Sequence, residues 1–349
     1  MEASDPAAQH GTHIQEIGEF GLIGRLRKGM QTSADPDLLR GIGDDAAVYR
    51  IGDGKVHVIT TDALIEGVHF VRTYTPLVYL GIKAIAVNVS DVVAMNARPK
   101  FATVTVGIPH DMTVEMVEEL YRGMDQACRL YGLQIIGGDT VASRRLVLNI
   151  TVIGEALEGE VVYRSGAEVG DVLVLTGDVG ASYAGLQTLL DLARTAGPDG
   201  IDPDELDAHR YVIKRHLTPE AQLNVLGILE QAEVRPTSMI DVSDGLASEV
   251  GHLCAQSGVS AILKAVHIPI DLETRAVAEQ REEDVDTYAL YGGEDYQLLM
   301  TLSPEDVSRL DPEQFLVIGE IVEGADEAPR IKGPDGTLHP MQSLGFTHF

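Results

Sequence analysis

The stretch VHVITTD, residues 56–62, alternates apolar and polar side chains and ends in two threonines and an aspartate. Alternation with a period of two is typical of a strand with one buried face. A shorter alternating segment, residues 46–49, precedes it, and an apolar segment from Pro76 to about Ala97 follows it as a predicted helix. This order predicts an α/β chain whose polar groups at strand ends bind a ligand.

Acidic residues recur beside Gly, Ser or Thr at the ends of predicted strands and turns, and few cations accompany them. Two carboxylates about 4 Å apart repel by roughly 4 kcal/mol at an effective dielectric near 20, so a converging set must take up protons or bind a divalent cation. Oxygen ligands without His or Cys favour Mg²⁺ over zinc. The motifs are Gly43-Asp44-Asp45, Thr60-Thr61-Asp62, Asn88-Val89-Ser90-Asp91, Gly137-Gly138-Asp139-Thr140, Asp241-Val242-Ser243-Asp244-Gly245 and Gly292-Gly293-Glu294-Asp295.

The predicted helix after Pro76 carries Ala84, Asn88 and Asp91 on one face, because residues three and four apart share a side of a helix. Placing a carboxylate among apolar side chains costs free energy unless a positive group is paired with it. The stripe is either an ordinary exposed polar face or part of the ligand site. The neighbouring acidic motifs favour the site.

The remaining patterns divide the chain into two α/β halves. The first continues with a strand over 101–108, a helix over 113–131, a strand over 134–136 that turns at Gly137-Gly138-Asp139, and a strand over 146–155. The second opens with a strand over 172–176. We predict a disordered leader at residues 1–13, an N-terminal α/β domain at 14–157 and a C-terminal α/β domain at 158–349.

The charge of the chain restricts its partners. There are 54 acidic and 26 basic residues, a net charge of −28, so we expect neither nucleic acid nor an anionic membrane as a partner. A phosphate ligand would have to arrive with metal. Cys128 and Cys254 are predicted as buried apolar groups in a reducing compartment. We find no basic and apolar leader and no apolar run approaching 18 residues, and therefore expect a cytoplasmic protein.

Several common catalytic motifs are missing from the sequence. Gly54-Lys55 is followed by Val56, so there is no phosphate-binding G-x-x-x-x-G-K-[ST] loop, and there is no G-x-S-x-G turn. Residues 177–180, GDVG, match only part of a dinucleotide fingerprint. Ser243 is either a phosphate or metal-shell ligand or a helix cap, and both roles are compatible. The chemistry that remains possible is metal-assisted phosphoryl transfer, in which the protein positions the reactants and neutralises charge.

With these motifs the sequence closely resembles the thiamine-monophosphate kinase family of the aminoimidazole-ribonucleotide-synthetase-like ATP-binding superfamily. The resemblance extends from residue 18 to residue 349 and passes in order through GIGDDAAV, TTDALIEGVHF, KAIAVNVSDVVAM, GGDT, DVSDGL and YGGEDYQLL. It implies Mg²⁺-dependent transfer of the ATP γ-phosphoryl group to thiamine monophosphate by direct in-line attack. It also implies a homodimer whose N-terminal sheets join into a barrel, with ATP between the domains.

The resemblance further implies roles for matched residues. The metal ligands would be Asp45, Thr60, Thr61, Asp62, Asp91, Asp139, Asp241 and Asp244. The ATP contacts would be Tyr121, Gly138, Asp139, Arg164 and Ser243, and the substrate contacts would be His69, Glu294 and Phe346. The sequence departs from the family at Asn96, often Gly, at Glu249, often Asp, and at Phe346, frequently Trp, which puts fine pocket geometry in doubt.

Two other classes of function stay open. The first is another ATP-dependent enzyme of the same superfamily, with an aminoimidazole-ribonucleotide-synthetase-like activity, against which the EGVHF and GFTHF segments argue. A selenophosphate synthetase should have a reactive Cys near its N-terminus, and a hydrogenase-maturation homologue should end in a Cys-bearing tail; neither pattern is present. The second class is a non-catalytic divalent-cation-binding protein, although no calcium-loop motif is present.

Overall fold

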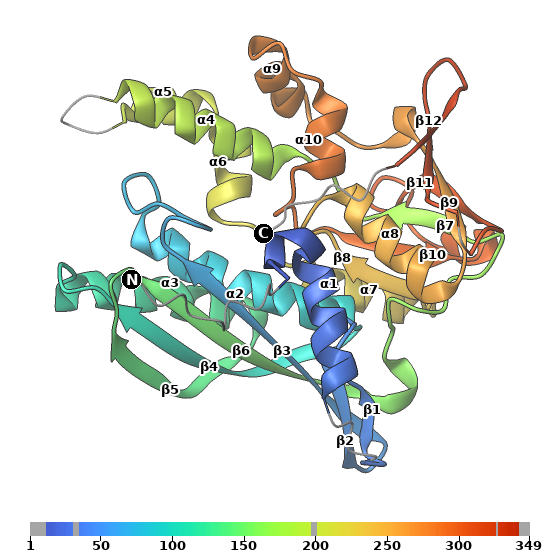
Figure 1. Cartoon of the computed structure of the whole chain (residues 1–349), viewed down its shortest axis with the longest axis horizontal. Helices are drawn as coiled ribbons and strands as arrows, with labels where there is room; N and C mark the ends of the chain where they lie inside the picture. Colours follow the sequence, from blue (N-terminus) through green and yellow to red (C-terminus); the bar gives the residue numbers. More distant parts are fainter. Residues whose placement is uncertain (1–11, 31–34, 197–200, 326, 342–349) are drawn as a thin grey trace, which may run out of the picture.

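The computed structural model describes residues 12–30, 35–196, 201–325 and 327–341. Its strands form two mixed sheets, and helices lie between and beside them (Figure 1). Residues 38–157 supply the first sheet and residues 172–340 supply the second. The expected α/β class is confirmed, with two domains and two mixed sheets. The domain limits at 157 and 158 stay a prediction, and residues 1–11 of the predicted leader lie outside the described part.

The first sheet has the order β1-β2-β3-β6-β4-β5. All neighbours are antiparallel except β4 and β5, which are parallel. The long β3 alternates because Val56, Val58 and Thr60 are buried while Thr61 faces the other side. The strands are β1 (Leu38–Arg40), β2 (Ala47–Gly52), β3 (Lys55–Ile65), β4 (Arg98–Ile108), β5 (Gln134–Ala142) and β6 (Val147–Leu157).

Helices α2 (Leu77–Ala94) and α3 (Val114–Tyr131) pack closely together on one face of this sheet (Figure 1). Two glycines make the contact possible: a Cβ on Gly81 would lie 2.1 Å from the Leu120 carbonyl oxygen, and one on Gly123 would lie 1.9 Å from that of Val78. Thr113 caps α3, because its side chain accepts a hydrogen bond from the Met116 N–H. Helix α1 (Ile14–Gly29) is kinked at Gly18.

The second sheet has the order β13-β12-β9-β11-β7-β10-β8, with β9 and β12 parallel and the other neighbours antiparallel. Its strands are β7 (Val172–Leu175), β8 (Ser238–Asp241), β9 (Ser260–Lys264), β10 (Leu298–Leu302), β11 (Leu316–Val322), β12 (Arg330–Lys332) and β13 (Leu338–Pro340). The associated helices are α4 (Ala181–Thr195), α5 (Pro203–Ala208), α6 (Arg210–Leu217), α7 (Leu223–Ala232), α8 (Leu246–Ser257), α9 (Leu272–Gln280), α10 (Val285–Tyr291) and α11 (Pro304–Val307). Short 3₁₀ turns are η1 (Glu158–Glu160) and η2 (Ala265–His267).

The two halves share an apolar core. On β7, Val174 joins the buried cluster that contains α2 and α7, whereas Leu173 and Leu175 join the cluster that contains α8. On β8, Met239 belongs to the cluster that contains α2 and α7, and Ile240 belongs to the cluster that contains α8. The second sheet therefore lies between α7 on one side and α8 on the other, and α2 lies between the two sheets. This position makes α2 the central element of the molecule.

Helix α2 is long and apolar enough to cross a membrane, contrary to the expectation that no apolar run approaches 18 residues. However, 78% of its 18-residue window is buried inside the protein. Its apolar surface is covered by the first sheet, by α3 and by α7. The hydropathy of α2 is therefore that of a core helix.

The predicted turn at Gly137-Gly138-Asp139 is wrong, because β5 continues through these residues to Ala142. Gly138 pairs with Val104, and a Cβ at this position would lie 1.8 Å from the Val104 carbonyl oxygen. The glycine thus permits close approach of two strands, a role that sequence alone does not separate from a turn. Likewise, Asp62 is not at the end of β3, which runs on to Ile65.

Candidate active site

Three aspartates from three elements converge where the two halves meet. Asp45 precedes β2, Asp91 lies in α2 and Asp241 ends β8. One carboxylate oxygen from each lies within 4.8 Å of the others. We call this group the acidic cluster. It combines residues that are up to 196 positions apart, the difference between 241 and 45.

Two hydroxyl groups fix carboxylates of the acidic cluster. Ser90 Oγ donates a hydrogen bond of 2.6 Å to Asp241 Oδ2, which joins α2 to β8. Thr60 Oγ1 donates a hydrogen bond of 2.5 Å to Asp91 Oδ2, which joins β3 to α2. Ser90 is completely buried. On the polar stripe of α2, Asn88 is buried and Asp91 is partly buried, so the stripe is not an ordinary exposed face.

Arg164 supplies a positive charge at the cluster. Its Nε and Nη2 atoms lie 3.0 and 2.5 Å from Asp45 Oδ1. The other oxygen, Asp45 Oδ2, is buried and has no hydrogen-bond partner among the described residues. Asp45 is 8% exposed, so water cannot easily replace that partner. A buried carboxylate oxygen without a partner, in a residue close to two further carboxylates, is suited to bind a cation.

Burial raises the pKa of every member of the acidic cluster. The pKa of Asp45 rises to about 7, because desolvation exceeds the opposing effect of Arg164, and the Asp241 charge adds to the rise. The pKa of Asp241 rises to about 6 mainly through burial. Burial, followed by the charges of Asp62, Asp241 and Asp45, raises the pKa of Asp91 well above its ordinary range. Among the described residues, Arg164 is the cation bonded to the cluster, and its charge offsets the rise in the Asp45 pKa only in part.

Asp62 and Asp244 extend the electrostatic field of the cluster. Burial, and then the Asp244 charge, raises the pKa of Asp62 to about 6. The Asp62 N–H donates to Asn88 Oδ1 at 2.9 Å, so α2 also fixes this part of β3. The Asp244 N–H donates to Glu249 Oε1 at 2.8 Å, and Ser243 Oγ lies 3.5 Å from the same oxygen. Ser243 therefore lies at the N-terminal end of α8, beside the cluster.

Four residues predicted for the site lie apart from the acidic cluster in this single chain. Thr61 faces the opposite side of β3, where its hydroxyl donates to the Ile150 carbonyl at 3.0 Å. Gly138 and Asp139 lie on β5, the edge strand, and both are exposed. Tyr121 lies on α3, half-buried against the core. Metal or ATP roles for these residues stay predictions, and Phe346 lies outside the described residues.

A second charged group surrounds Glu294. Lys83 Nζ, from α2, lies 2.8 Å from Glu294 Oε1 and 2.9 Å from Oε2. His216 Nδ1, from α6, lies 3.3 Å from Oε2. His69 is held by its Nδ1, which accepts the Ile65 N–H at 3.0 Å, and its charge lowers the pKa of Glu294. His69 and Glu294, both predicted substrate contacts, are thus electrostatic neighbours.

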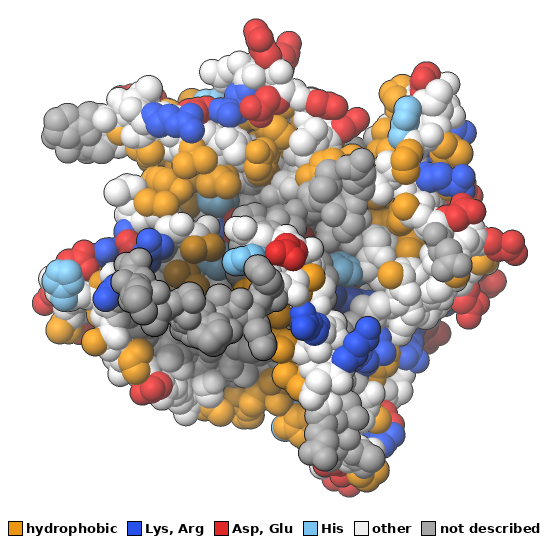
Figure 2. Space-filling view, in the orientation of Figure 1, with side chains coloured by type: hydrophobic (Ala, Val, Ile, Leu, Met, Phe, Trp, Pro, Cys, Tyr) orange, Lys and Arg blue, Asp and Glu red, His pale blue; other side chains and the backbone are white. Residues whose placement is uncertain are grey.

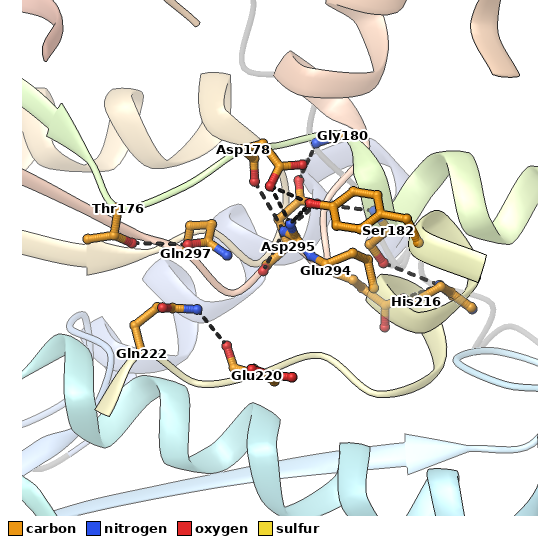
Figure 3. A network of polar contacts seen from close by, with 12 residues as sticks. Thr176, Asp178, Gly180, Ser182, His216, Glu220, Gln222, Glu294, Asp295 and Gln297 are labelled. Atoms are coloured by element: carbon orange, nitrogen blue, oxygen red, sulfur yellow. Dashed lines mark hydrogen bonds and ion pairs between the residues drawn. The ribbon is translucent and has the colours of Figure 1, made fainter. Parts of the chain in front are cut away.

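Figure 3 shows a network of polar contacts near Glu294 that includes Asp178, His216 and Asp295. Asp295 accepts hydrogen bonds from the N–H groups of Gly180 and Ser182, at 2.6 and 3.2 Å. Arg215 Nη1 lies 2.6 Å from Asp178 Oδ1. Residues 177–180, GDVG, therefore lead into α4, and the Asp295 carboxylate accepts hydrogen bonds from N–H groups at the N-terminus of this helix.

A cavity of about 530 Å³ opens at the end of the first sheet, beyond the acidic cluster. It lies where β3, β4 and β5 end, and Figure 2 shows charged and histidine side chains close together at that end of the molecule. Among the predicted site residues, none lines it. Its lining residues are Glu66, Gly67, Val71, Arg72, His110, Asp111, Arg144 and Arg145.

Sequence reasoning missed Lys83 and His216 as members of the site, and it named Glu249 only as a departure from the family pattern. Lys83 had a signal, because it is the one cation in the apolar run from residue 77 to residue 94. Glu249 is almost completely buried, and burial raises its pKa well above the ordinary value. His216 had no local signal, because its partners lie on distant segments.

Comparison with known proteins shows the same family over both halves. Residues 43–156 match the AIR synthase related protein N-terminal domain, and residues 168–332 match the corresponding C-terminal domain. Thiamine-monophosphate kinase of Aquifex aeolicus is 36% identical over 288 residues, 82% of this chain and 87% of that protein. The Bacillus subtilis enzyme of that name is 34% identical over 343 residues, 95% of this chain and 100% of that protein.

Solved structures agree with these relatives. A structure described as AaThiL complexed with AMPPCP and TMP has a TM-score of 0.83 and 34% identity, and the match covers 98% of this chain and 100% of that one. A hydrogenase maturation protein HypE in complex with ATP has a TM-score of 0.66 at 19% identity, which shows a common fold alone. The chain therefore belongs to the thiamine-monophosphate kinase family of AIR synthase related proteins, and it is an enzyme of the ATP-dependent phosphotransferase class.

Proposed function

We propose that this protein transfers the γ-phosphoryl group of ATP to thiamine monophosphate, giving thiamine diphosphate and ADP, with Mg²⁺ and by direct in-line attack. One observation supports this most strongly: the buried cluster of Asp45, Asp91 and Asp241, with an unpartnered Asp45 oxygen, lies where the two halves of a member of this family meet. The relative with 34% identity that binds AMPPCP and TMP supports the same pair of substrates here.

The residues around the acidic cluster are suited to hold Mg²⁺. Carboxylate and hydroxyl oxygens are the ligands that this ion prefers. Burial and mutual repulsion raise the pKa values of the carboxyl groups, and a bound cation would stabilise their charged forms in place of protons. When bound, Mg²⁺ neutralises phosphate charge and orients the transferred group. The residues that would hold it are Asp45, Thr60, Asp62, Asp91, Asp241 and Asp244.

The chain itself would position ATP and need not supply a base. Arg164, beside Asp45, and Ser243, at the start of α8, lie where phosphate oxygens would approach the acidic cluster. The attacking phosphate of thiamine monophosphate has a second pKa of about 6 and is largely ionised at neutral pH. Ser90 is fully buried and bonded to Asp241, which argues against a covalent phosphoserine at this position.

The thiamine side of the pocket would be formed by His69, Glu294 and Phe346. Glu294 and His69 come from different halves of the chain and are electrostatic neighbours, which supports their placement on one ligand. Glu294 offers a carboxylate to the cationic thiazolium ring. Phe346 would add an aromatic face, a contact typically worth about 0.5 to 2 kcal/mol with a cation.

We propose a homodimer in which the first sheets of two copies join into a barrel. The sheet face opposite α2 and α3 carries exposed Phe101, and the edge strand β5 exposes Ile136 and Val141. A partner that covers this face would bury these side chains and could bring Asp139 toward a site. Sedimentation should give twice the 37.5 kDa chain mass, and a monomer at all concentrations would contradict the dimer.

We expect the protein to lie in the cytoplasm, because its proposed substrate ATP is supplied there and because its composition is compatible with that location.

The experiment that tests the proposed function is product analysis with ATP and a panel of acceptors. Thiamine monophosphate should give thiamine diphosphate and ADP in equal amounts, and only with Mg²⁺. Thiamine should not replace thiamine monophosphate. If ATP is consumed only with the aminoimidazole ribonucleotide precursor, the related synthetase activity is the correct one. If Mg²⁺ binds and no acceptor supports turnover, the chain is a cation-binding protein without this activity.

A further inference from the structure

Among the described residues, the buried cation Lys83 has one carboxylate partner, Glu294, which comes from the other half of the chain. Lys83 lies in the middle of the core helix α2 and is 2% exposed. Its Nζ contacts both Glu294 oxygens, at 2.8 and 2.9 Å, and the His216 carbonyl oxygen at 3.3 Å. The three ammonium protons therefore all have acceptors. Lys83 has no exposed surface with which to bind a substrate directly.

Glu294, in contrast, keeps part of its side chain accessible. Its side chain is 27% exposed, although Lys83 and His216 contact its carboxylate. The backbone holds it as well: Glu294 has φ of 57°, a left-handed conformation that non-glycine residues rarely adopt, and its N–H donates to the Ser243 carbonyl at 2.7 Å. The geometry directs the carboxylate toward α2 while one side remains open.

We propose that Lys83 is a positioning residue, which keeps the Glu294 carboxylate charged and fixed in orientation for the cationic ring of the substrate. This inference rests on the proposed function and adds a residue to it. The ion pair crosses between the halves of the chain, so it also requires α2 and the 292–297 segment to be in contact. Lys83 acts through Glu294 and not on the transferred phosphoryl group.

The groups that face Glu294 support this assignment. Burial, and then the Lys83 charge, lowers the pKa of His216 to about 3, so this histidine is neutral and Lys83 is the cation. Burial acts to raise the pKa of Glu294, but the Lys83 charge, together with the hydrogen bond that Lys83 donates, opposes it and leaves that pKa below the ordinary value. Burial, and then the Glu294 charge, raises the pKa of Tyr74 and of Tyr296 above the ordinary value, so both tyrosines stay neutral.

Removing the Lys83 charge should therefore leave a carboxylate that takes up a proton near neutral pH. In Lys83→Gln, which retains a hydrogen-bond donor, we expect KM for thiamine monophosphate to rise about tenfold at pH 6 and to fall within about twofold of wild type at pH 9. The KM for ATP should change little at either pH. Lys83→Arg should restore the flat profile of the wild type if the larger side chain is accommodated.

A matched control is available on α6. Lys214 lies 2.7 Å from Glu220 in an exposed pair, with 61% of the lysine side chain accessible, so Lys214→Gln removes the same charge outside the pocket and should leave both KM values unchanged. In the Glu294→Gln background, Lys83→Gln should add no further pH dependence. A pH-independent loss in Lys83→Gln that persists in this background would overturn the proposal, because it would indicate a purely structural lysine.

A second measurement does not depend on the substrate. Difference infrared titration of Lys83→Gln against Lys83→Gln/Glu294→Gln should reveal one carboxyl group that titrates above pH 6 in the ligand-free chain. If no such carboxyl group is seen, Lys83 does not maintain the charge of Glu294 and the inference is wrong. If the group titrates as expected and wild type fails to use thiamine monophosphate, the proposed substrate is wrong while the role of Lys83 stands.

Discussion

At the scale of the residue, Asp45 shows how the site differs from an ordinary acidic surface. One of its oxygens is bonded to Arg164, and the other is buried without a partner among the described residues. Its pKa of about 7 results mainly from desolvation, which the neighbouring guanidinium offsets only in part. The cation that we propose to be shared with Asp91 and Asp241 would offset the energetic cost of this arrangement.

Asp62→Asn should lower kcat by about 100-fold or more while the chain remains folded, because a neutral amide cannot replace a carboxylate that balances Mg²⁺ charge. The fold should persist, since Asn88 bonds to the main chain of residue 62 and not to its side chain. Steady-state kinetics and circular dichroism would measure both effects. Asp53→Asn is the control, because Asp53 is exposed and has φ of 53°, which Asn tolerates. Equal activity of the two variants would refute a role for Asp62.

Sequence reasoning locates the carboxylates of the cluster better than it locates their neighbours. Acids beside Gly, Ser and Thr predict Asp45, Asp91 and Asp241 as a group, and these three do lie together. The placement of Thr61 could not be predicted, because it depends on which face of β3 the helices cover. The partners Lys83 and Glu294 are 211 positions apart, so only the folded chain brings them together.

At the scale of the element, α2 connects the site to the core of both halves. It carries Lys83, Asn88, Ser90 and Asp91, while its remaining surface packs against the first sheet and α3. Its helical period was readable from the sequence and its limits agree to within about three residues. The extent of β5 was not readable, because a glycine pair is compatible with a turn and with close strand contact.

The α2–α3 contact gives a prediction at this scale. Gly123→Ala should destabilise the protein by about 3 kcal/mol, because its Cβ would lie 1.9 Å from the Val78 carbonyl oxygen and the helices must separate. Gly227→Ala in α7 is the matched control, because nothing lies within 4 Å of its added Cβ. It should stabilise the protein by about 0.5 to 1 kcal/mol. Chemical denaturation measures both, and equal effects would contradict the close packing of α2 and α3.

At the scale of the whole molecule, the two halves meet at α2 through a shared apolar core and through polar pairs such as Ser90 with Asp241 and Lys83 with Glu294. The overall two-domain class was predictable from the order of elements and from the motifs. The sandwich of the second sheet between α7 and α8 was not, because long-range strand pairing of β7, β10 and β11 determines it.

The stability of the molecule should depend on Mg²⁺ more strongly as pH rises. The raised pKa values of Asp45, Asp62 and Asp241, about 7, 6 and 6, exceed the ordinary value of about 3.9 in an unfolded chain. Their contribution to stability is therefore complete below pH about 4 and is lost as pH rises through about 6 to 7. Mg²⁺ with an ATP analogue should raise Tm by at least about 2 °C more at pH 8 than at pH 5.5, measured by calorimetry. An equal shift at both pH values would contradict proton competition at the cluster.

The most direct test of the central claim is the stereochemistry of transfer from ATP that carries an isotopically chiral γ-phosphoryl group. We propose that positioned carboxylates, an arginine and Mg²⁺ bring the donor and acceptor phosphates together, and that no side chain accepts the phosphoryl group on the way. A single in-line displacement inverts the configuration at phosphorus, so thiamine diphosphate should be formed with inversion. Retention of configuration would require a covalent phosphoenzyme and would contradict the account.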